Sequence, residues 1–354
     1  MKKLLPEVCT IQYGFPFDSA KFSDSNGMPL IRIRDVVRGY SETYTTEEYK
    51  SEYIVHENDL LIGMDGEFNI AKWGKTPALL NQRVCRLAPK DSIDKDYLFY
   101  FMPIALKRIE EKTPFVTVKH LSAKELNKIE IPVLSLEEQR KIAETLSKAD
   151  KLIAFRDQQL AKLDEVVKAR FVEMFGDEQA FNKEPLSQNV EEMFIGPFGS
   201  SLKNENFVSK ENGYCMVYEQ KHAIRKTMDV ETRYIDKPKY EELKRFSIHG
   251  GDIIVSCRGT IGETYIVPLN APLGIMHPSI MKIRVKDSIY NRVFFDFLLQ
   301  EKLKQHEAQA NGSGVKMAVT ASALGKEEFI VPSIPFQNQF AAFVERVDQQ
   351  KQTV

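Results

Sequence analysis

The chain has 354 residues, and its 49 lysines and arginines nearly balance 50 aspartates and glutamates, for a formal net charge of −1. This balance excludes a protein that coats nucleic acid through overall positive charge, but it leaves room for local basic patches. The length predicts two domains and a connecting element, and the 43% hydrophobic content is that of an ordinary globular protein.

Residues 1–134 form the first predicted domain, in which short strand-like runs alternate with turn signals. The apolar run 29–33 has the length of a strand. Arg32 and Arg34 stand two residues apart at its end, so both side chains are expected on one face. Residues 97–109 predict an amphipathic helix rich in aromatic side chains. This alternation is typical of a mixed α/β domain.

The segment 135–176 predicts one long helix. Ser135 and Glu138 have the spacing of a capping box, and Gly176 is a typical helix stop. Between them, mostly apolar residues recur in steps of four and three, the pattern of a coiled-coil seam. About 40 residues at 1.5 Å each make a rod of roughly 60 Å, long enough to hold two domains apart. The seam residues expected to pair with another helix include Ile142, Leu146, Ile153, Leu160, Leu163 and Val167.

Residues 177–334 form a second predicted domain that repeats the frame of the first. Asp59 and the apolar residues after it return as Asp252 and its followers, and the stretch 131–139 returns as 331–339. Between such anchors the two copies share little, which suggests one fold that reads two different targets. The anchors near the start of each copy, 182 residues apart, are Val8, Gly14, Ser19 and Lys21, then Val190, Gly196, Ser201 and Lys203.

A shorter helix of the same kind is predicted for residues 335–354, with a seam through Phe340, Val344 and Val347. The two seams could pair antiparallel, or each helix could pack against its own domain. We favour pairing for the long helix because its seam is longer than any single domain face. The expected fold class is α+β, with two mixed α/β domains separated by long coiled-coil-like helices.

The cysteines and the start of the chain predict a soluble, cytoplasmic protein. The four cysteines lie far apart and form no Cys-x-x-Cys pair, which favours free thiols over disulfides or zinc. The first apolar stretch is only Leu4-Leu5 before Pro6, so no signal peptide is expected. No apolar run has the length of a membrane span, so no membrane partner is expected either.

No catalytic motif stands out in the sequence. It contains no P-loop, no Asn-Pro-Pro-Tyr/Phe signature of amino-methyltransferases and no His-Glu-x-x-His zinc helix. The six histidines have no ligand spacing, and no carboxylate pair has the character of an acid/base dyad. We therefore predict no catalytic residue, no metal site and no cofactor held by this chain.

Basic and amide residues gather at matching places in both copies. Arg reads guanine and Asn or Gln reads adenine in the major groove of DNA, whereas Lys near Gly and Ser suits phosphate contact. Each residue alone could be ordinary surface charge, so the prediction rests on the recurrence of the clusters. The candidate DNA contacts are Ser19, Lys21, Arg32, Arg34, Lys72, Gln82 and Arg83 in the first copy, and Ser200, Ser201, Lys203, Gln220, Lys221, Arg258 and Lys316 in the second.

Over essentially its whole length, the chain resembles the specificity subunits of type I restriction–modification systems. The most specific part is the stretch 131–142 with the long helix after it, which is similar to the family's central conserved region. The stretch 331–339 is similar to the distal conserved region. Segments 78–86 and 196–200 are similar to stretches common in the family's target-recognition domains.

The resemblance implies two target-recognition domains that each read half of a bipartite site in double-stranded DNA. The conserved helices would fix the gap between the half-sites and dock two methyltransferase subunits, and restriction/translocase subunits would join that core. The chain would catalyse nothing itself. S-adenosylmethionine would belong to the methyltransferase, and ATP and Mg to the restriction subunit. Family members usually have two comparable helices, so the short distal helix is a departure.

Three other functions stay open from the residues alone. The chain could be an enzyme that acts on nucleic acid, although the missing motifs weigh against it. It could be a coiled-coil adaptor whose domains bind protein, or a shortened specificity subunit that binds DNA or partners without supporting restriction. Salt dependence of DNA binding separates the DNA-binding readings from the protein adaptor, because phosphate contacts release counterions.

Overall fold

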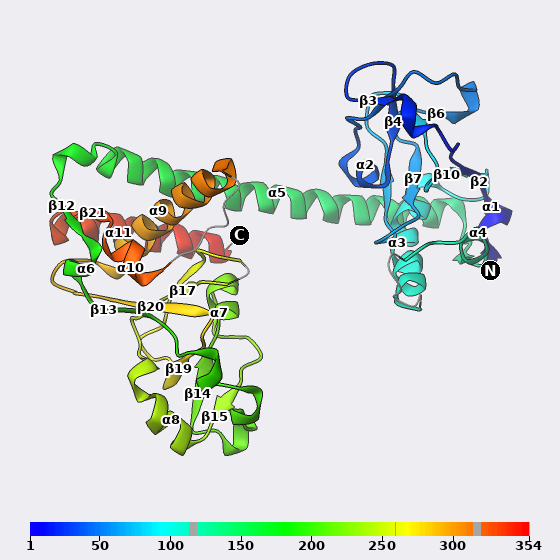
Figure 1. Cartoon of the computed structure of the whole chain (residues 1–354). Coiled ribbons are helices and arrows are strands. Elements are labelled where there is room, and N and C mark those ends of the chain that lie inside the picture. Colours follow the sequence, from blue (N-terminus) through cyan, green and yellow to red (C-terminus); the bar gives the residue numbers. More distant parts are fainter. Residues whose placement is uncertain (113–118, 259, 314–319, 354) are drawn as a thin grey trace. The chain divides into compact units, whose positions relative to one another are not determined.

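The computed structural model describes residues 1–112, 119–258, 260–313 and 320–353. The chain divides into two compact units, Met1–Phe155 (unit 1) and Arg156–Val354 (unit 2), with the boundary inside the long helix α5 (Leu136–Phe175) (Figure 1). Each unit has its own sheets, helices and hydrophobic core. The predicted α+β class, with two sheet-containing domains and a long helix, is therefore confirmed.

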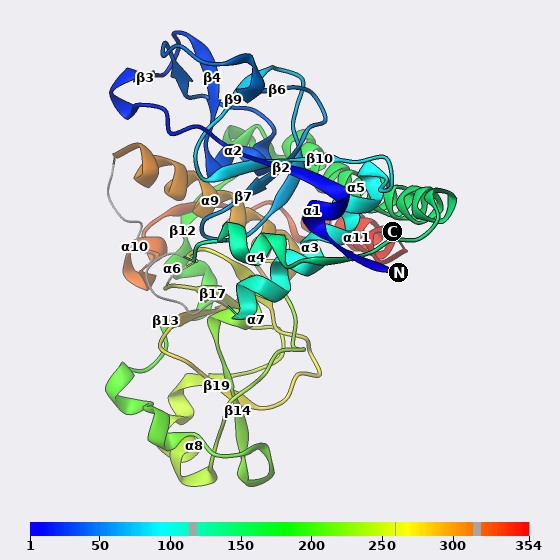
Figure 2. The ribbon, with the colours of Figure 1, turned by 90° about the vertical axis from the view of Figure 1, so that its right-hand side faces the viewer.

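Unit 1 contains a four-stranded antiparallel sheet and, beyond one end of it, a five-stranded sheet (Figure 2). In spatial order, the first consists of β2 (Cys9–Tyr13), β10 (Val84–Pro89), β7 (Leu60–Gly63) and β8 (Ile70–Lys72). The second consists of β3 (Phe22–Ser23), β5 (Tyr44–Thr45), β4 (Met28–Ile31), β9 (Ala78–Leu80) and β6 (Ile54–Val55). A small ribbon pairs β1 (Lys2–Leu4) with β11 (Glu130–Pro132).

The helices of unit 1 cover the sheets with apolar faces. They are α1 (Leu5–Val8), α2 (Ile33–Arg38), α3 (Lys95–Lys112) and α4 (Ala123–Asn127). The predicted amphipathic helix is α3, which buries Leu98, Met102 and Leu106 in one cluster with Leu60 and Leu87 of the four-stranded sheet. Leu98, Met102 and Leu106 follow at steps of four, the spacing that brings side chains to one helix face.

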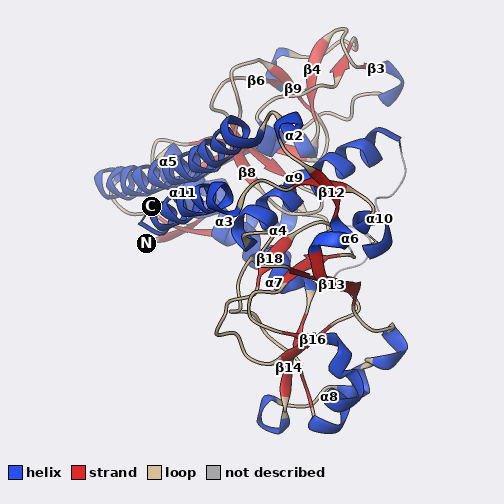
Figure 3. Cartoon of the chain, turned by 90° about the vertical axis from the view of Figure 1, so that its left-hand side faces the viewer, coloured by secondary structure: helices blue, strands red, loops and turns tan. Residues whose placement is uncertain are grey.

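Unit 2 repeats this plan (Figure 3). Its antiparallel sheet has the order β13 (Val190–Ile195), β20 (Ile280–Val285), β17 (Ile253–Ser256) and β18 (Thr264–Ile266). The second sheet has the order β15 (Tyr234–Ile235), β14 (Cys215–Tyr218), β19 (Gly274–Met276) and β16 (Ser247–Ile248), and β12 (Lys183–Pro185) pairs with β21 (Glu328–Ile330). The helices are α6 (Leu186–Asn189), α7 (Gln220–Arg225), α8 (Lys237–Leu243), α9 (Arg292–Ser313), α10 (Ala321–Gly325) and α11 (Ile334–Thr353).

The register of the strands confirms that the two units are copies of one fold. Strands β2, β10, β7 and β8 pair in the same order and sense as β13, β20, β17 and β18. The only parallel pairs between named strands in the described residues, β4 with β9 and β14 with β19, also correspond. The two copies therefore share their topology while their sequences differ.

A buried glutamine at the start of each long helix marks the same point in both units. Gln139 and Gln337 are both fully buried, and their Oε1 atoms accept the N–H of Asp94 at 2.8 Å and of Asn291 at 2.9 Å. These equivalents lie 198 residues apart. The predicted match of 131–139 with 331–339 was wrong by two residues, because identical letters, rather than the buried amide and its helix start, had been aligned.

Helix α5 begins and ends as its sequence predicts. Ser135 Oγ accepts the N–H of Glu138 at 3.3 Å, and the Glu138 carboxylate accepts the N–H of Ser135 at 3.0 Å, which completes the capping box. Gly176 N–H donates to Val172 O at 2.8 Å after the last turn. In the part of the chain that the structure describes, no helix has both the length and the apolar character needed to cross a bilayer.

Helix α11 packs antiparallel on the C-terminal half of α5 (Figures 1 and 3). The direction follows from two contacts, because Phe340 lies 5.8 Å from Phe175 between ring centroids, whereas Lys351 forms a 2.7 Å ion pair with Asp164. The seam residues buried in one cluster here are Leu163, Val167, Phe340, Val344 and Val347, and Leu160 is half-buried. The remaining seam residues Ile142, Leu146 and Ile153 are 38%, 40% and 61% exposed.

Candidate nucleic-acid interface

Three loops of unit 1 meet at one end of its four-stranded sheet. The loop after β2 is fixed to the β9–β10 turn, because Phe15 N–H donates to Leu80 O and Gln82 N–H donates to Phe15 O, both at 2.9 Å. The loop after β7 joins them through Met64 N–H, which donates to Arg83 O at 2.9 Å. This set of loops, residues 14–18, 64–66 and 81–83, is named loop junction 1.

Unit 2 has the same arrangement at the equivalent end of its sheet. Gly196 N–H donates to Ile280 O at 3.0 Å, and Cys257 N–H donates to Ser279 O at 2.9 Å. The loops after β13 and β17 thereby meet the β19–β20 turn. Residues 196–198, 256–258 and 277–279 are named loop junction 2.

Each junction contains a glycine where two backbones approach closely. A Cβ atom on Gly14 would collide with the carbonyl oxygen of Asn81, and one on Gly196 would collide with that of His277. The obstacle is backbone in both cases, so it cannot move aside as a flexible side chain would. The recurrence of Gly14 and Gly196 in the sequence therefore reflects a fixed loop root in both units.

The two junctions carry their cations on different loops. Arg83 lies on the β9–β10 turn in a left-handed conformation (φ 76°), 54% exposed, with its Nε 3.6 Å from Asp65 on the loop after β7. Asp65 also lies 2.5 Å from His120 Nδ1. In loop junction 2, Arg258 is exposed on the loop after β17, and Ser279 occupies the β19–β20 turn. One frame thus presents two different charge patterns.

Hydroxyl and lysine side chains directly follow each junction in the chain. Ser19 and Lys21 are exposed in the 3-10 turn Ser19–Lys21. In unit 2, Ser200 and Ser201 lie in the 3-10 turn Gly199–Ser201, and Lys203 is 59% exposed with its nearest carboxylate 3.9 Å away. Exposed hydroxyls and a lysine next to glycine suit phosphate contacts.

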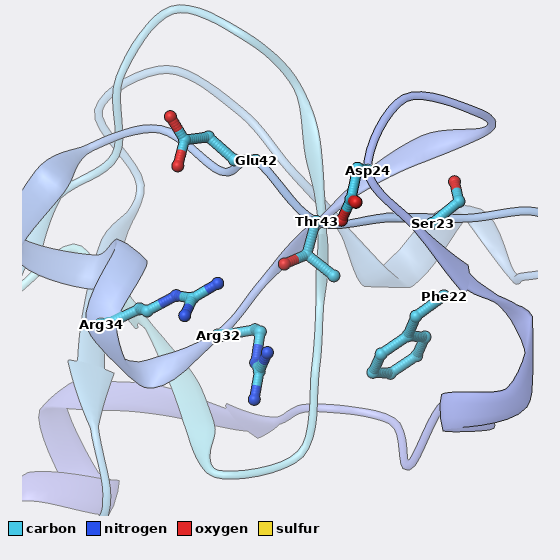
Figure 4. Close-up of a pocket in the computed structure, with 7 residues that line it drawn as sticks. All are labelled: Phe22, Ser23, Asp24, Arg32, Arg34, Glu42 and Thr43. Carbon is cyan, nitrogen blue, oxygen red and sulfur yellow. The ribbon is translucent and has the colours of Figure 1, made fainter. Parts of the chain in front are cut away.

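The expected strand through Arg32 and Arg34 was wrong. Strand β4 ends at Ile31, and Arg32 is the N-cap of α2 because the Asp35 carboxylate accepts its backbone N–H at 2.8 Å. This capping bond favours helix over strand at once after a short apolar run. Both arginine side chains are nevertheless exposed and line the same pocket at the rim of the five-stranded sheet (Figure 4).

The equivalent cap in unit 2 carries a carboxylate that is already engaged. Glu219 precedes α7, and its backbone N–H donates to His222 Nδ1 at 3.0 Å. Its side chain pairs with Arg233 and, at 2.9 Å, with Lys221. Burial raises the pKa of the Glu219 carboxyl, but the hydrogen bonds from Arg233 and Lys221 outweigh it, so the pKa falls below its ordinary value. Gln220, half-buried, follows in the same helix.

Two predicted contacts lie apart from these loops. Lys72, at the end of β8, forms a 2.8 Å ion pair with Asp96 and lies over the ring of Phe99, so it ties the sheet to α3. Lys316 lies outside the described residues. The described part of the chain also holds no group of three or more His, Cys, Asp or Glu side chains suited to a metal ion.

Two candidate residues were missed at the sequence level. Asp24 lies across the pocket from Arg32, and its signal was the Ser-Asp-Ser-Asn-Gly turn that precedes β4. Phe198, in loop junction 2, is 86% exposed, which is exceptional for a large apolar side chain. Its place directly after Gly196 and before two serines was the available signal.

The comparisons with known proteins agree with this duplicated arrangement. Residues 1–165 and 199–353 match the family model described as the type I restriction modification DNA specificity domain. The chain belongs to this family. A solved structure of the type I restriction–modification S subunit from M. genitalium covers 100% of the chain and 90% of its own length with a TM-score of 0.55 at 16% identity, which shows the same fold.

Curated relatives match at different lengths. The specificity subunit of the type I restriction enzyme EcoBI from Escherichia coli is 41% identical over 164 residues, 46% of this chain and 34% of that relative. The putative MjaX specificity subunit from Methanocaldococcus jannaschii is 22% identical over 353 residues, 92% of this chain and 81% of that relative. The match with the first thus spans about a third of the relative's length.

Proposed function

We propose that the chain is the DNA-recognition subunit of a type I restriction–modification enzyme and that units 1 and 2 each read one half of a bipartite site. The observation that carries this proposal is the pair of loop junctions. They occupy the same end of the same sheet, are fixed by equivalent backbone hydrogen bonds, and present different side chains. A fixed frame with exchangeable loop residues is what independent reading of two half-sites requires.

The side chains around the junctions divide into positioning and reading groups. Lys21 and Lys203, with neighbouring serines, would contact phosphates and set the position of each unit without selecting sequence. Arg83 and Arg258 project from the junctions themselves and would contact base edges. Because these cations lie on different loops, the two half-sites would differ in sequence.

Helix α5 would set the spacing between the half-sites and, with α11, dock two methyltransferase subunits. Restriction/translocase subunits would join the assembly in the cytoplasm. The chain would be non-catalytic and hold no cofactor, because methyl transfer would use S-adenosylmethionine on the methyltransferase, and cleavage would use ATP and Mg on the restriction subunit.

A methylation map tests the proposal. The chain is co-expressed with its methyltransferase partner in a host that lacks adenine methylation, and modified bases are read across the genome. We expect an interrupted two-part motif. Exchange of residues 1–134 for those of another family member should change one half of the motif and leave the other half intact.

A point variant refines the same test. Arg83→Ala should relax or weaken recognition of one half-site, with Arg108→Ala on α3 as a control at an exposed arginine far from loop junction 1 in the sheet order. Equal loss at both halves would contradict the assignment of unit 1 to one half-site. A soluble complex that methylates nothing would favour a form that binds without supporting modification, and failure to co-purify would favour the adaptor function.

A further inference from the structure

The pocket at the rim of the five-stranded sheet in unit 1 has a volume of about 610 Å³ and gathers charges of both signs. Arg32 and Arg34 line one side and Asp24 the opposite side, with Glu42 at its edge (Figure 4). The ring of Phe22 and the hydroxyls of Ser23 and Thr43 complete the lining. The pocket therefore offers hydrogen-bond donors and acceptors side by side.

Only two of these four charged groups are free to bind a ligand. Arg34 Nε lies 3.7 Å from the buried Asp35 carboxylate, and Glu42 lies 3.8 Å from Arg38. In the described part of the chain, the Arg32 guanidinium and the Asp24 carboxylate form no ion pair or side-chain hydrogen bond. A guanidinium without a partner faces a carboxylate without a partner across the same open space.

This combination disfavours a phosphate and favours the edge of a base pair. A phosphate at Arg32 would sit near the carboxylates of Asp24 and Glu42, whose like charge opposes it. A G·C pair instead presents two adjacent acceptors, guanine N7 and O6, followed by the cytosine N4 amino donor. An A·T pair places a donor between its acceptors, which a two-pronged guanidinium cannot match.

We propose that Arg32 and Asp24 read one G·C base pair in the half-site of unit 1. Arg32 donates two hydrogen bonds to guanine, and Asp24 accepts one from cytosine N4. This assignment rests on the proposed function and deepens it, because it names the base pair and the residues that select it. At the equivalent helix cap of unit 2, Glu219 is held by Arg233 and Lys221, so the assignment applies to unit 1 alone.

The test uses the full chain with its methyltransferase partner and compares methylation maps of wild type, Arg32→Ala, Arg32→Lys and Asp24→Asn. We expect every Arg32 variant to lose discrimination at one G·C position of one half-site by about 5- to 150-fold, the range of a bidentate Arg–guanine contact. Asp24→Asn, which cannot accept as strongly, should relax the same position less. The other half-site should stay unchanged.

Two controls make the outcome specific. Arg108→Ala removes an exposed arginine of the same unit and should leave the motif intact. The folding of each Arg32 variant is checked by its melting temperature, which should not change, because the capping bond to Asp35 comes from the backbone N–H of residue 32.

The failures are distinguishable. If wild type gives no two-part motif, the proposed function fails and this assignment falls with it. If wild type gives the motif but Arg32→Ala weakens all sequences equally and lowers the salt slope by about one, Arg32 contacts a phosphate and the assignment alone is wrong. An unchanged map for Arg32→Ala also overturns it.

Discussion

Units 1 and 2 agree where side chains are buried beneath the sheet and differ where they face solvent at its end. Both place an aspartate–arginine pair across equivalent strands, Asp59 with Arg86 at 3.0 Å and Asp252 with Arg284 at 2.7 Å. Both fix their loops with equivalent backbone hydrogen bonds. The shared polar pairs thus hold the frame, and the loop residues are left free to diverge.

The difference is sharpest at the cap of the helix after the first parallel strand. In unit 1 the cap presents Arg32, whose guanidinium has no ion pair among the described residues, and Asp35 accepts the capping bond. In unit 2 the cap presents Glu219, tied to Arg233 and Lys221, and His222 accepts the capping bond. One helix start therefore supports two opposite charge patterns, which is consistent with two different targets.

The largest expected effect comes from breaking the shared ion pair. Asp252 is 1% exposed, so Asp252→Ala leaves the cation of Arg284 partly buried and loses the hydrogen bond to His249 N–H; we expect a loss of about 3–5 kcal/mol in the free energy of unfolding. Asp59 is 27% exposed, so Asp59→Ala should cost clearly less. Denaturant unfolding measures both. Equal losses would show that burial does not separate the two pairs.

The junction glycines give the next effect. Gly196→Ala drives a Cβ atom into the carbonyl oxygen of His277, and we expect a loss of about 1–3 kcal/mol from the forced backbone shift. Gly199→Ala, three residues on in the same loop, meets no atom within 4 Å and should change stability little. Thermal unfolding of both variants checks this difference. If both behave alike, close approach at Gly196 does not fix the loop.

The sequence was informative where a local pattern decides the structure. The cap at Ser135, the stop at Gly176 and the spaced apolar seam place α5, because helix ends and faces depend on residues only a few positions apart. The recurrence of Gly14 and Gly196 also marked a true backbone constraint. These features needed no knowledge of distant contacts.

The sequence failed where short elements compete or distant segments meet. A six-residue helix capped by Asp35 replaced the strand expected at Arg32, because one capping bond outweighs the preference of a short apolar run. Asp24 reaches the pocket because β3 pairs with β5, a contact across more than 20 residues that no local pattern encodes. Lys72 was counted as a surface cation, although Asp96 binds it.

The two caps also predict different responses to pH. Burial lowers the pKa of His222 below its ordinary value of 6.5, so the unfolded chain binds a proton more readily than the folded one. Stability of unit 2 should therefore fall as the pH drops below 6.5 and level off below the folded pKa. Asp35 occupies this place in unit 1, so His222→Asp should reduce the dependence. His277, whose pKa burial also lowers, should account for part of what remains.

The measurement is the unfolding midpoint of wild type, His222→Asp and His277→Asn between pH 7.5 and about 5, followed by a probe local to unit 2 such as amide hydrogen exchange. A pH response equal in both units would contradict the difference drawn between the caps. So would a His222→Asp variant that keeps the full wild-type slope.

The smallest expected effect concerns the two halves of α5. Lys351 of α11 pairs with Asp164 at 2.7 Å, but Asp164 is 61% exposed, so Lys351→Ala should cost no more than about 1 kcal/mol. The apolar seam beneath it matters more. Val167, 5% exposed, packs with Phe340 and Val347, whereas Ile153, on the same seam, is 61% exposed. In the isolated chain, Ile153→Ala should therefore be nearly neutral, and Val167→Ala should cost more than Lys351→Ala. If Ile153→Ala is neutral alone but weakens co-purification with the methyltransferase, the exposed half of the seam serves a partner, while the half under α11 stabilises unit 2.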